Sequence, residues 1–161
     1  MTGVHRIGRR ELDPPSRPRY GYAGRRLVVE LPALEVRVEE LNADYLVSYL
    51  GGRGINVHYL YQHRDPEASP LAAENPILFA TGPFAGTLYP GGGRFNVTGP
   101  SPQTGLLGDS NAGGFWGPAL KACGFDQLVI TGRVEGPCVL AVTESSVALY
   151  RLPELAEATV K

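Results

Sequence analysis

The sequence is poor in cysteine and in long hydrophobic runs, and each scarcity excludes a class of protein. Cys123 and Cys138 are the two cysteines among 161 residues. Two are too few for a disulfide framework and have no metal-ligand spacing, so we interpret both as core residues. A reduced, cytoplasmic setting fits this pattern. The apolar runs fall far short of the roughly 20 residues that a membrane-spanning helix needs, so no membrane partner is predicted.

An excess of charge of either sign is also missing. The chain carries 15 Lys and Arg against 16 Asp and Glu, a net charge of −1. Such a balance gives no field that would attract nucleic acid or an anionic membrane, and neither partner is predicted. Arg9 and Arg10 are followed by Glu-Leu-Asp-Pro-Pro rather than by an apolar stretch. This pair is therefore not interpreted as an export signal.

Glycine, in contrast, is abundant. The chain has 21 glycines in 161 residues, where about 7% is usual. Eleven of them lie between Gly82 and Gly117, without a repeat and with apolar residues interleaved. This pattern favours ordered loops, with positive φ angles or with backbone held close to a bulky group, over disorder.

Composition divides the chain into two parts. Residues 1–19 hold five arginines and three prolines but few large apolar residues. They are predicted to be a flexible tail, with a subunit-docking arm as the alternative. Residues 20–161 are predicted to form one domain, with truncation at its C-terminal end left open.

Hydrophobic periodicity and turn residues indicate the elements of that domain. Strands are predicted at residues 27–31, 34–39, 77–80, 94–98, 127–131, 138–143 and 147–152, the last two forming a hairpin. Helices are predicted at residues 44–50, 55–63 and 114–122, with Asn42 as the first N-cap and Gly124 as the last C-cap. Strands outnumber helices and several are neighbours in sequence. The predicted fold is α+β, mainly antiparallel sheet with a few short helices.

The glycine-rich segment contains one arginine suited to binding an anion. Arg94 follows three glycines, so its guanidinium can present a planar fork of donors to phosphate oxygens. Gly113 and Gly114 precede a predicted helix, whose first N–H groups favour an anion nearby. Neither the P-loop nor the Rossmann signature is present. By themselves the residues leave two interpretations equally open: a site for an anionic ligand, or tight turns with a solvated Arg94.

A series of short motifs resembles, in order, the N-terminal part of the tungsten-containing aldehyde:ferredoxin oxidoreductase family. The motifs are Tyr-Gly-Tyr-Ala-Gly at 20–24, Leu-Gly-Gly-Arg-Gly at 50–54, Ala-Thr-Gly-Pro at 80–83 followed by Gly-Thr at 86–87, Gly-Gly-Arg-Phe-Asn-Val at 92–97, Ser-Pro at 101–102 with Thr-Gly at 104–105, Asp-Ser-Asn-Ala-Gly-Gly-Phe-Trp-Gly-Pro at 109–118, Leu-Lys at 120–121 and Gly-Phe-Asp at 124–126. The resemblance covers roughly residues 20–152. One such motif would be weak, but this many in series are specific.

The resemblance implies a sheet-rich base domain on which a tungsten (or molybdenum) bis-pterin cofactor sits. By match, Arg94 contacts the cofactor, and Asn111, Ala112 and Gly113 lie against the pterin. The backbone oxygen of Asn111 is expected to help hold a magnesium ion that bridges the two pterin phosphates. Tungsten itself is held by sulfur atoms of the pterins. No protein ligand to tungsten and no catalytic residue is therefore expected in this chain.

The resemblance also implies an activity and the parts that must accompany it. The family oxidises aldehydes to carboxylic acids and passes electrons through a 4Fe-4S cluster to ferredoxin. The Cys-x-x-Cys-x-x-x-Cys run that holds the cluster is absent from this sequence. The cluster is expected on the remaining catalytic domains or on a partner subunit, and the chain alone is expected to be inactive. A homodimer is left open.

Two alternative functions remain beside that one. The first is a stand-alone module that binds or transfers a pterin cofactor without redox activity. The second is a part of a related tungsten-dependent aromatic-ring reductase. A neighbouring reading frame with the cluster cysteines would favour an enzyme split over two chains.

Other residues are weaker candidates. His58 and His63 lie five residues apart among tyrosines and are weak candidates for a ligand or catalytic role. For Arg53, a cofactor contact and bonds to loop carbonyls are equally favoured. Two carboxylates and one aromatic are interpreted structurally: Asp109 and Asp126 as turn or capping residues, and Trp116 as a core or interface residue rather than a cover for the pterin.

Overall fold

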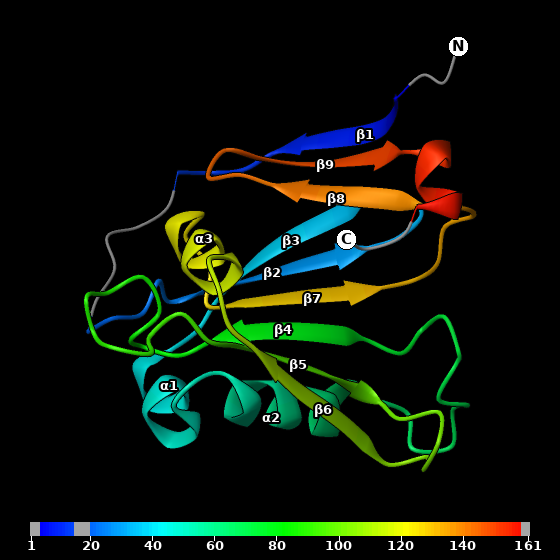
Figure 1. Cartoon of the computed structure of the whole chain (residues 1–161). Coiled ribbons are helices and arrows are strands. Elements are labelled where there is room, and N and C mark those ends of the chain that lie inside the picture. Colours follow the sequence, from blue (N-terminus) through cyan, green and yellow to red (C-terminus); the bar gives the residue numbers. More distant parts are fainter. Residues whose placement is uncertain (1–3, 15–19, 159–161) are drawn as a thin grey trace.

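The computed structural model describes residues 4–14 and 20–158 (Figure 1). Its strands are β1 (His5–Glu11), β2 (Arg25–Glu30), β3 (Glu35–Glu40), β4 (Ile77–Thr81), β5 (Phe95–Pro100), β6 (Leu107–Ala112), β7 (Gln127–Thr131), β8 (Cys138–Val142) and β9 (Ser146–Arg151). Its helices are α1 (Ala43–Tyr49), α2 (Arg53–His63), α3 (Trp116–Ala122) and a short 3-10 helix, η1 (Pro153–Glu157).

The strands form two sheets. The larger has the order β3-β2-β7-β4-β5-β6 and the smaller the order β1-β9-β8. Neighbouring strands are antiparallel except β2 and β7, which pair in parallel. The predicted α+β class is confirmed, with a larger sheet that is mixed rather than purely antiparallel.

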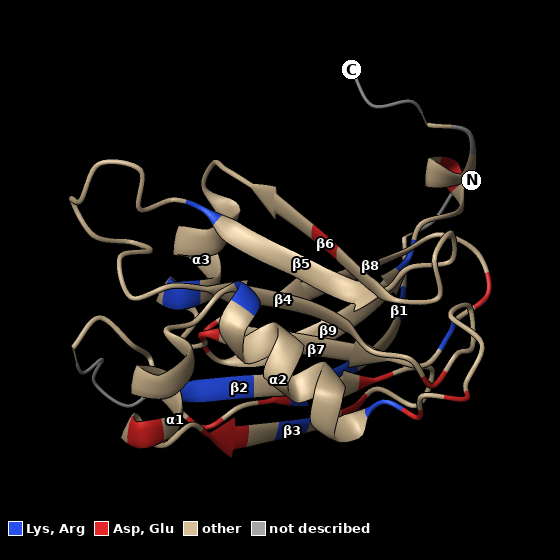
Figure 2. Ribbon diagram, turned by 90° about the horizontal axis from the view of Figure 1, so that it is seen from below, with Lys and Arg blue, Asp and Glu red and all other residues tan. Residues whose placement is uncertain are grey.

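The helices cover opposite faces of the larger sheet. Leu78 of β4 clusters with Tyr59 and Leu60 of α2, whereas the ring of its neighbour Phe79 contacts Trp116 of α3. Successive side chains of a strand point to opposite faces, so α2 and α3 lie on different sides of β4. Seen from below, α1 and α2 lie in front of the larger sheet (Figure 2).

The main apolar core lies on the side of α3, between the larger sheet and the smaller one. Its buried members come from both sheets, from the turn between β2 and β3, and from α3 and the chain segment after it: Leu27, Val29, Leu34, Leu120, Phe125, Leu128, Val147 and Leu149. The alternation of β2 and β7 puts Leu27, Val29 and Leu128 on this face. The two sheets and α3 are therefore held together by burial of apolar surface.

The tail prediction requires a correction. Residues 5–11, predicted to be flexible, form β1 and pair with β9 from His5 opposite Arg151 to Glu11 opposite Ser146. Leu12 then packs against the main core. Composition did not reveal this strand because its stabilising bonds are made by backbone groups, which every residue carries. The other part of the predicted tail, residues 1–3 and 15–19, lies outside the described residues.

The predicted helix boundaries hold to within about two residues. The side-chain oxygen of Asn42 accepts a hydrogen bond from the backbone N–H of Tyr45 at 2.7 Å, which confirms the N-cap of α1. Helix α3 begins at Trp116 rather than at residue 114, because Gly114 has a φ of +98°. Its C-cap is Cys123, and Gly124 follows with a φ of +88°. Glycine tolerates this left-handed conformation and ends the helix there.

None of the helices in the described residues is long and apolar enough to cross a membrane.

Candidate functional site

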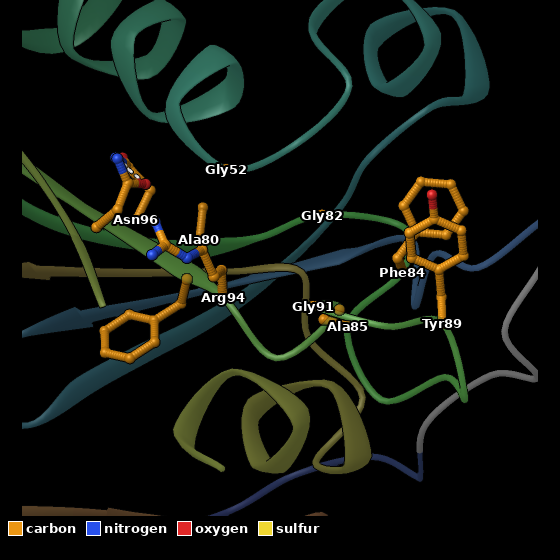
Figure 3. A pocket seen from close by; sticks show the side chains of 12 residues that line it. Gly52, Ala80, Gly82, Phe84, Ala85, Tyr89, Gly91, Arg94 and Asn96 are labelled. Carbon is orange, nitrogen blue, oxygen red and sulfur yellow. Dashed lines mark hydrogen bonds between the residues drawn. The ribbon is translucent and has the colours of Figure 1, made fainter. Parts of the chain in front are cut away.

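A cavity of about 260 Å³ lies where the start of α2, the end of β4, the start of β5 and the end of β6 meet (Figure 3). Much of its wall comes from the loop that joins β4 to β5. Its lining consists of glycine and alanine, three aromatic rings, one arginine and two asparagines: Gly52, Ala80, Gly82, Phe84, Ala85, Tyr89, Gly91, Gly92, Arg94, Phe95, Asn96 and Asn111.

Glycine allows this loop to fold closely on itself. A Cβ atom on Gly92 would lie 2.4 Å from the carbonyl oxygen of Phe84, a distance that real Cβ atoms do not show. Gly82 and Gly91 differ, because a Cβ on either would meet no atom within 4 Å. The first kind of glycine shapes the loop, and the second kind leaves open space along the pocket wall. A ligand could therefore approach the backbone there.

Arg94 is the one positively charged residue in the lining of this pocket. It is exposed, and its side chain forms no ion pair or hydrogen bond with any residue in the described part of the chain. Its guanidinium lies on the same side of the pocket as Asn96 and Ala80 (Figure 3). A guanidinium in a pocket without a protein acceptor can donate to an anionic ligand.

Aromatic rings occupy two parts of this region. Phe84 and Tyr89 stack with ring centroids 4.5 Å apart and are 55% and 60% exposed. Phe95 instead contacts Trp116, with centroids 4.5 Å apart, and Trp116 also contacts Phe79. Trp116 thus packs against two aromatic side chains of the sheet while 39% of its surface stays exposed. The stacked pair lies on the side of the pocket away from Arg94 and Asn96 (Figure 3).

Strand pairing brings Asn111 to the pocket beside Asn96. Asn96 of β5 is directly opposite Asn111 of β6, and Phe95 is opposite Ala112. The Asn96 amide donates to the Asn111 side-chain oxygen at 3.2 Å. Ala112 and Gly113 are exposed and do not line the pocket. Of the four residues predicted to bind cofactor, the structure brings Arg94 and Asn111 into one cavity and leaves Ala112 and Gly113 on the adjoining surface.

Sequence reasoning missed both β6 and the role of Asn96. Strand β6 has the sequence Leu-Gly-Asp-Ser-Asn-Ala, with one large apolar residue and no alternation. The sequence places Asn96 in a glycine-rich motif, whereas the structure buries it at 2% exposure. An asparagine between Phe95 and Val97 in a predicted strand was the available signal, since a buried amide needs polar partners.

Arg53 and Asp109 form an ion pair beside the pocket, with Nη2 and Oδ2 2.5 Å apart. Arg53 therefore pairs with a carboxylate rather than with a loop carbonyl. Its contact with a cofactor stays a prediction. Asp109 lies inside β6 rather than in a turn or a cap. Partial burial acts to raise the pKa of Asp109, but the hydrogen bond from Asn96 and the charge of Arg53 outweigh it, so its pKa lies below the ordinary value.

Asp126 has a structural role, although not the predicted one of a turn or cap. It is fully buried, and its carboxylate accepts backbone hydrogen bonds from Ala23 at 3.2 Å and Gly24 at 2.6 Å. Lys121 forms an ion pair with the same carboxylate and donates to the carbonyl of Gly21 at 3.1 Å. These contacts fix the segment before β2 against the start of β7.

The histidines and cysteines lie away from the pocket. His58 contacts the ring of Tyr49 at a centroid distance of 4.2 Å, and His63 stacks on Tyr59 at 4.0 Å. Cys123 and Cys138 are free thiols that pack against the main core, as predicted. Burial, together with the charge of Glu144, raises the pKa of the Cys123 thiol. Nowhere in residues 4–14 and 20–158 do three His, Cys, Asp or Glu side chains gather as a potential metal site.

The chain is similar to several known proteins. The family model of the aldehyde ferredoxin oxidoreductase N-terminal domain matches residues 26–161. The tungsten-containing aldehyde ferredoxin oxidoreductases of Thermococcus kodakarensis and Pyrococcus furiosus are 40% and 36% identical to this chain over 130 residues. Each match covers 81% of this chain and 22% of the relative. The chain thus spans about a fifth of the length of these curated relatives.

A solved structure is similar as well. It is the active-site complex BamBC of benzoyl coenzyme A reductase with 1,5-dienoyl-CoA, which aligns with a TM-score of 0.80 and 32% identity. The alignment covers 86% of this chain and 21% of that chain. The aliphatic sulfonate oxidoreductase, WOR-like subunit, of Pyrococcus furiosus is 32% identical over 133 residues.

Proposed function

We propose, from the premise that the chain belongs to the family of aldehyde ferredoxin oxidoreductase N-terminal domains, that its pocket binds a tungsten (or molybdenum) bis-pterin cofactor. The observation that carries the proposal is the guanidinium of Arg94, which has no partner among the described residues, in a pocket walled by glycine. The enzyme of which the domain is a part would oxidise aldehydes to carboxylic acids, with ferredoxin as the electron acceptor. The aldehyde ferredoxin oxidoreductases to which the chain is similar support that activity.

The residues present fit a large, anionic, partly flat cofactor. Arg94 supplies a fork of donors for phosphate or pterin oxygens. Gly82 and Gly91 leave backbone open for a close approach. The cavity, at about 260 Å³, is slightly smaller than the range of about 300–1,000 Å³ usual for whole ligands. It would therefore hold one part of the cofactor, and the remainder would lie on the adjoining surface.

Each predicted residue then has a task in binding. Arg94 would donate to oxygen atoms of the cofactor through the N–H groups of its guanidinium. The backbone oxygen of Asn111 would help hold a magnesium ion that accompanies the cofactor. Ala112 and Gly113, exposed at the end of β6, would lie against the pterin. When bound, the cofactor supplies the redox chemistry, and this chain's residues bind and orient it.

Further parts are needed for turnover. The sequence has no Cys-x-x-Cys-x-x-x-Cys run, so we place the 4Fe-4S cluster on the remaining catalytic domains or on a partner subunit. Electrons would leave through that cluster, and the chain alone would be inactive. We also propose a cytoplasmic location, supported by two free cysteines. A homodimer is compatible with this arrangement and would be tested by the molar mass in solution.

One observation favours a second candidate function. The similarity to the benzoyl coenzyme A reductase complex, at 32% identity, supports a tungsten-dependent reductase that acts on the aromatic ring of a thioester. The two candidates share the pterin site and differ in substrate. Assays of the cofactor-loaded protein with an aldehyde and with an aromatic coenzyme A thioester would separate them.

Replacing Arg94 tests the proposed site. In the full protein, Arg94→Ala should lower pterin and tungsten content, because one charge-assisted bond is lost. Affinity should fall roughly 10- to 150-fold if no neighbour compensates. Arg94→Lys should recover part of the loss, since an ammonium cannot reproduce the fork. Arg37→Ala is the matched control, because that arginine is also exposed, at 65%, but lies on β3.

The test of Arg94 is a measurement of cofactor content. Pterin and tungsten would be measured per mole of protein by fluorescence after oxidation and by plasma mass spectrometry. Equal contents in the wild type, Arg94→Ala and Arg37→Ala would show that Arg94 does not hold the cofactor.

A further inference from the structure

A row of residues crosses five strands of the larger sheet and ends at the pocket. Arg26 of β2 is opposite Gln127 of β7, which is opposite Ala80 of β4. Ala80 is opposite Asn96 of β5, which is opposite Asn111 of β6. Directly opposed residues share one face of a sheet. Four of the five side chains in the row are polar, although Gln127 and Asn96 are 0% and 2% exposed.

Helix α2 bridges the one apolar position in this row, which is Ala80. Ala80 has a short side chain, and Asn56 of α2 bonds to both of its neighbours in the row. The side-chain oxygen of Asn56 accepts from the Gln127 amide at 2.8 Å, and the Asn56 amide donates to the side-chain oxygen of Asn96 at 2.9 Å. Asn56 itself is fully buried. The row and the helix thus form one continuous chain of hydrogen bonds.

The chain of hydrogen bonds has a single direction. It starts at the Arg26 guanidinium, which donates to the Gln127 side-chain oxygen at 2.6 Å. It passes through Gln127, Asn56 and Asn96, and ends where the Asn96 amide donates to the Asp109 carboxylate at 2.6 Å. A guanidinium can only donate and a carboxylate can only accept. The three amides between them are therefore fixed in one orientation, since a flipped amide would oppose like groups.

The last amide of the chain also binds Asn111. The two protons of the Asn96 amide face three acceptors: the carboxylate of Asp109, the carbonyl of Ser110 at 3.1 Å, and the side-chain oxygen of Asn111 at 3.2 Å. Asn111 is otherwise exposed, and its side chain makes no other hydrogen bond with the described residues. Asn96 is therefore the group that fixes the side chain of Asn111.

We propose that Asn96 is a positioning residue that holds the side-chain amide of Asn111 at the pocket wall, where this amide contacts the ligand in addition to the backbone oxygen of Asn111. Asn56 and Asp109 fix Asn96 in turn. The proposal rests on the proposed function, in that the ligand is taken to be the pterin cofactor. A binding residue that is ordered before the ligand arrives loses less freedom on binding. Loss of this order should weaken binding by roughly 2- to 13-fold, the equivalent of one ordinary hydrogen bond.

Asn56 gives the sharpest test, because it belongs to the chain of hydrogen bonds but does not line the pocket. In the full protein, Asn56→Leu should speed the loss of pterin and tungsten during dialysis by roughly 2- to 13-fold. Val129→Ala is the control for stability alone. Val129 is fully buried and belongs to the apolar cluster between α2 and the same face of the sheet. Equal rates of loss in the two variants would overturn the proposal.

A double-mutant cycle tests whether Asn96 acts through Asn111. Asn96→Ser removes the amide donors, and Asn111→Ala removes the side chain that they hold while keeping the backbone oxygen. If Asn96 acts through Asn111, Asn96→Ser should speed cofactor loss in the wild type and add little in Asn111→Ala. Fully additive effects would contradict the proposal.

If Asn96→Ser does not fold, the milder variant Thr98→Val tests the same proposal. The Thr98 hydroxyl donates to the Asn96 side-chain oxygen at 2.6 Å. Thr98→Val removes that bond at nearly constant volume and should also speed cofactor loss, by less than Asn56→Leu does. No change relative to the wild type would count against the proposal. The proposed function fails separately, if Arg94→Ala retains its cofactor as the wild type does.

Discussion

The two faces of the larger sheet are built on different principles. The face toward α3 and the smaller sheet is apolar, with Leu27, Val29 and Leu128 buried against Val147 and Leu149. The face toward α2 carries an apolar cluster in its middle. At the end near the pocket, however, it carries the polar row from Arg26 to Asn111. Burial of apolar surface is non-directional, whereas a chain of amide hydrogen bonds fixes each group in one orientation.

This difference indicates that the two faces contribute differently to stability and to the geometry of the pocket. The apolar face provides the larger share of stability, because stabilisation grows with the apolar area removed from water. The polar row adds less, since a hydrogen bond within the protein replaces one to water. It lies next to the pocket, where a fixed geometry is useful to a ligand.

Phe125 is the largest fully buried side chain of the apolar face. Phe125→Ala should lower the free energy of unfolding by about 3–5 kcal/mol, from the lost transfer energy and the cavity left behind. Urea denaturation followed by circular dichroism would measure it. Phe115→Ala removes the same side chain at a position that is 90% exposed and should change stability by about 0.5 kcal/mol or less. Similar losses in both variants would contradict the assignment of the core.

Gln127→Leu tests the middle of the polar row at similar side-chain volume. The variant leaves the Nε–H of Arg26 without the acceptor found at 2.6 Å, and the side-chain oxygen of Asn56 without its donor. An unpaired buried polar group costs about 1–3 kcal/mol, which is the expected loss of unfolding free energy. Gln62→Leu, at an exposed position of α2, is the control. If Gln127→Leu is neutral, the hydrogen bonds of the row contribute nothing to stability.

Asp109 should produce the smallest effect, and it appears in acid. Its folded pKa lies below the ordinary value near 3.8, so its contribution is fully present well above that pH. The contribution is lost as the pH falls through the lower, folded pKa. The unfolding free energy of the wild type should therefore decline more steeply below about pH 4 than that of Asp109→Asn. Glu35→Gln, which removes an exposed carboxylate, serves as the control, and identical slopes for wild type and Asp109→Asn would contradict the role of Asp109.

The contrast between the faces also explains what the sequence could predict. Alternation of apolar and charged residues located β3, whereas short runs rich in apolar residues located β2, β4, β5, β7, β8 and β9. Asn42 located the start of α1 through its capping chemistry. Strands β1 and β6 were not predicted, because they are stabilised by backbone pairing and carry few apolar side chains. Composition holds little information on such pairing.

The candidate site was predictable to a similar extent. Arg94 and Asn111 were expected from motifs, and the structure places both in one pocket. The motifs carried the resemblance to the family that the comparisons confirm. The chain of hydrogen bonds behind Asn111 was not foreseen, because its members lie at positions 26, 56, 96 and 127, and only the fold brings them together. Hydrophobic periodicity cannot report a contact between residues so distant in sequence.

The central claim is that Arg94 and Asn111 bind a pterin cofactor in this pocket. A crystal structure of the full protein purified with its cofactor tests it most directly. We expect density for a pterin or its phosphate within hydrogen-bonding distance of the Arg94 guanidinium, and a cation at the backbone oxygen of Asn111. A pterin bound elsewhere, with the pocket filled by side chains of another part of the protein, would contradict the claim.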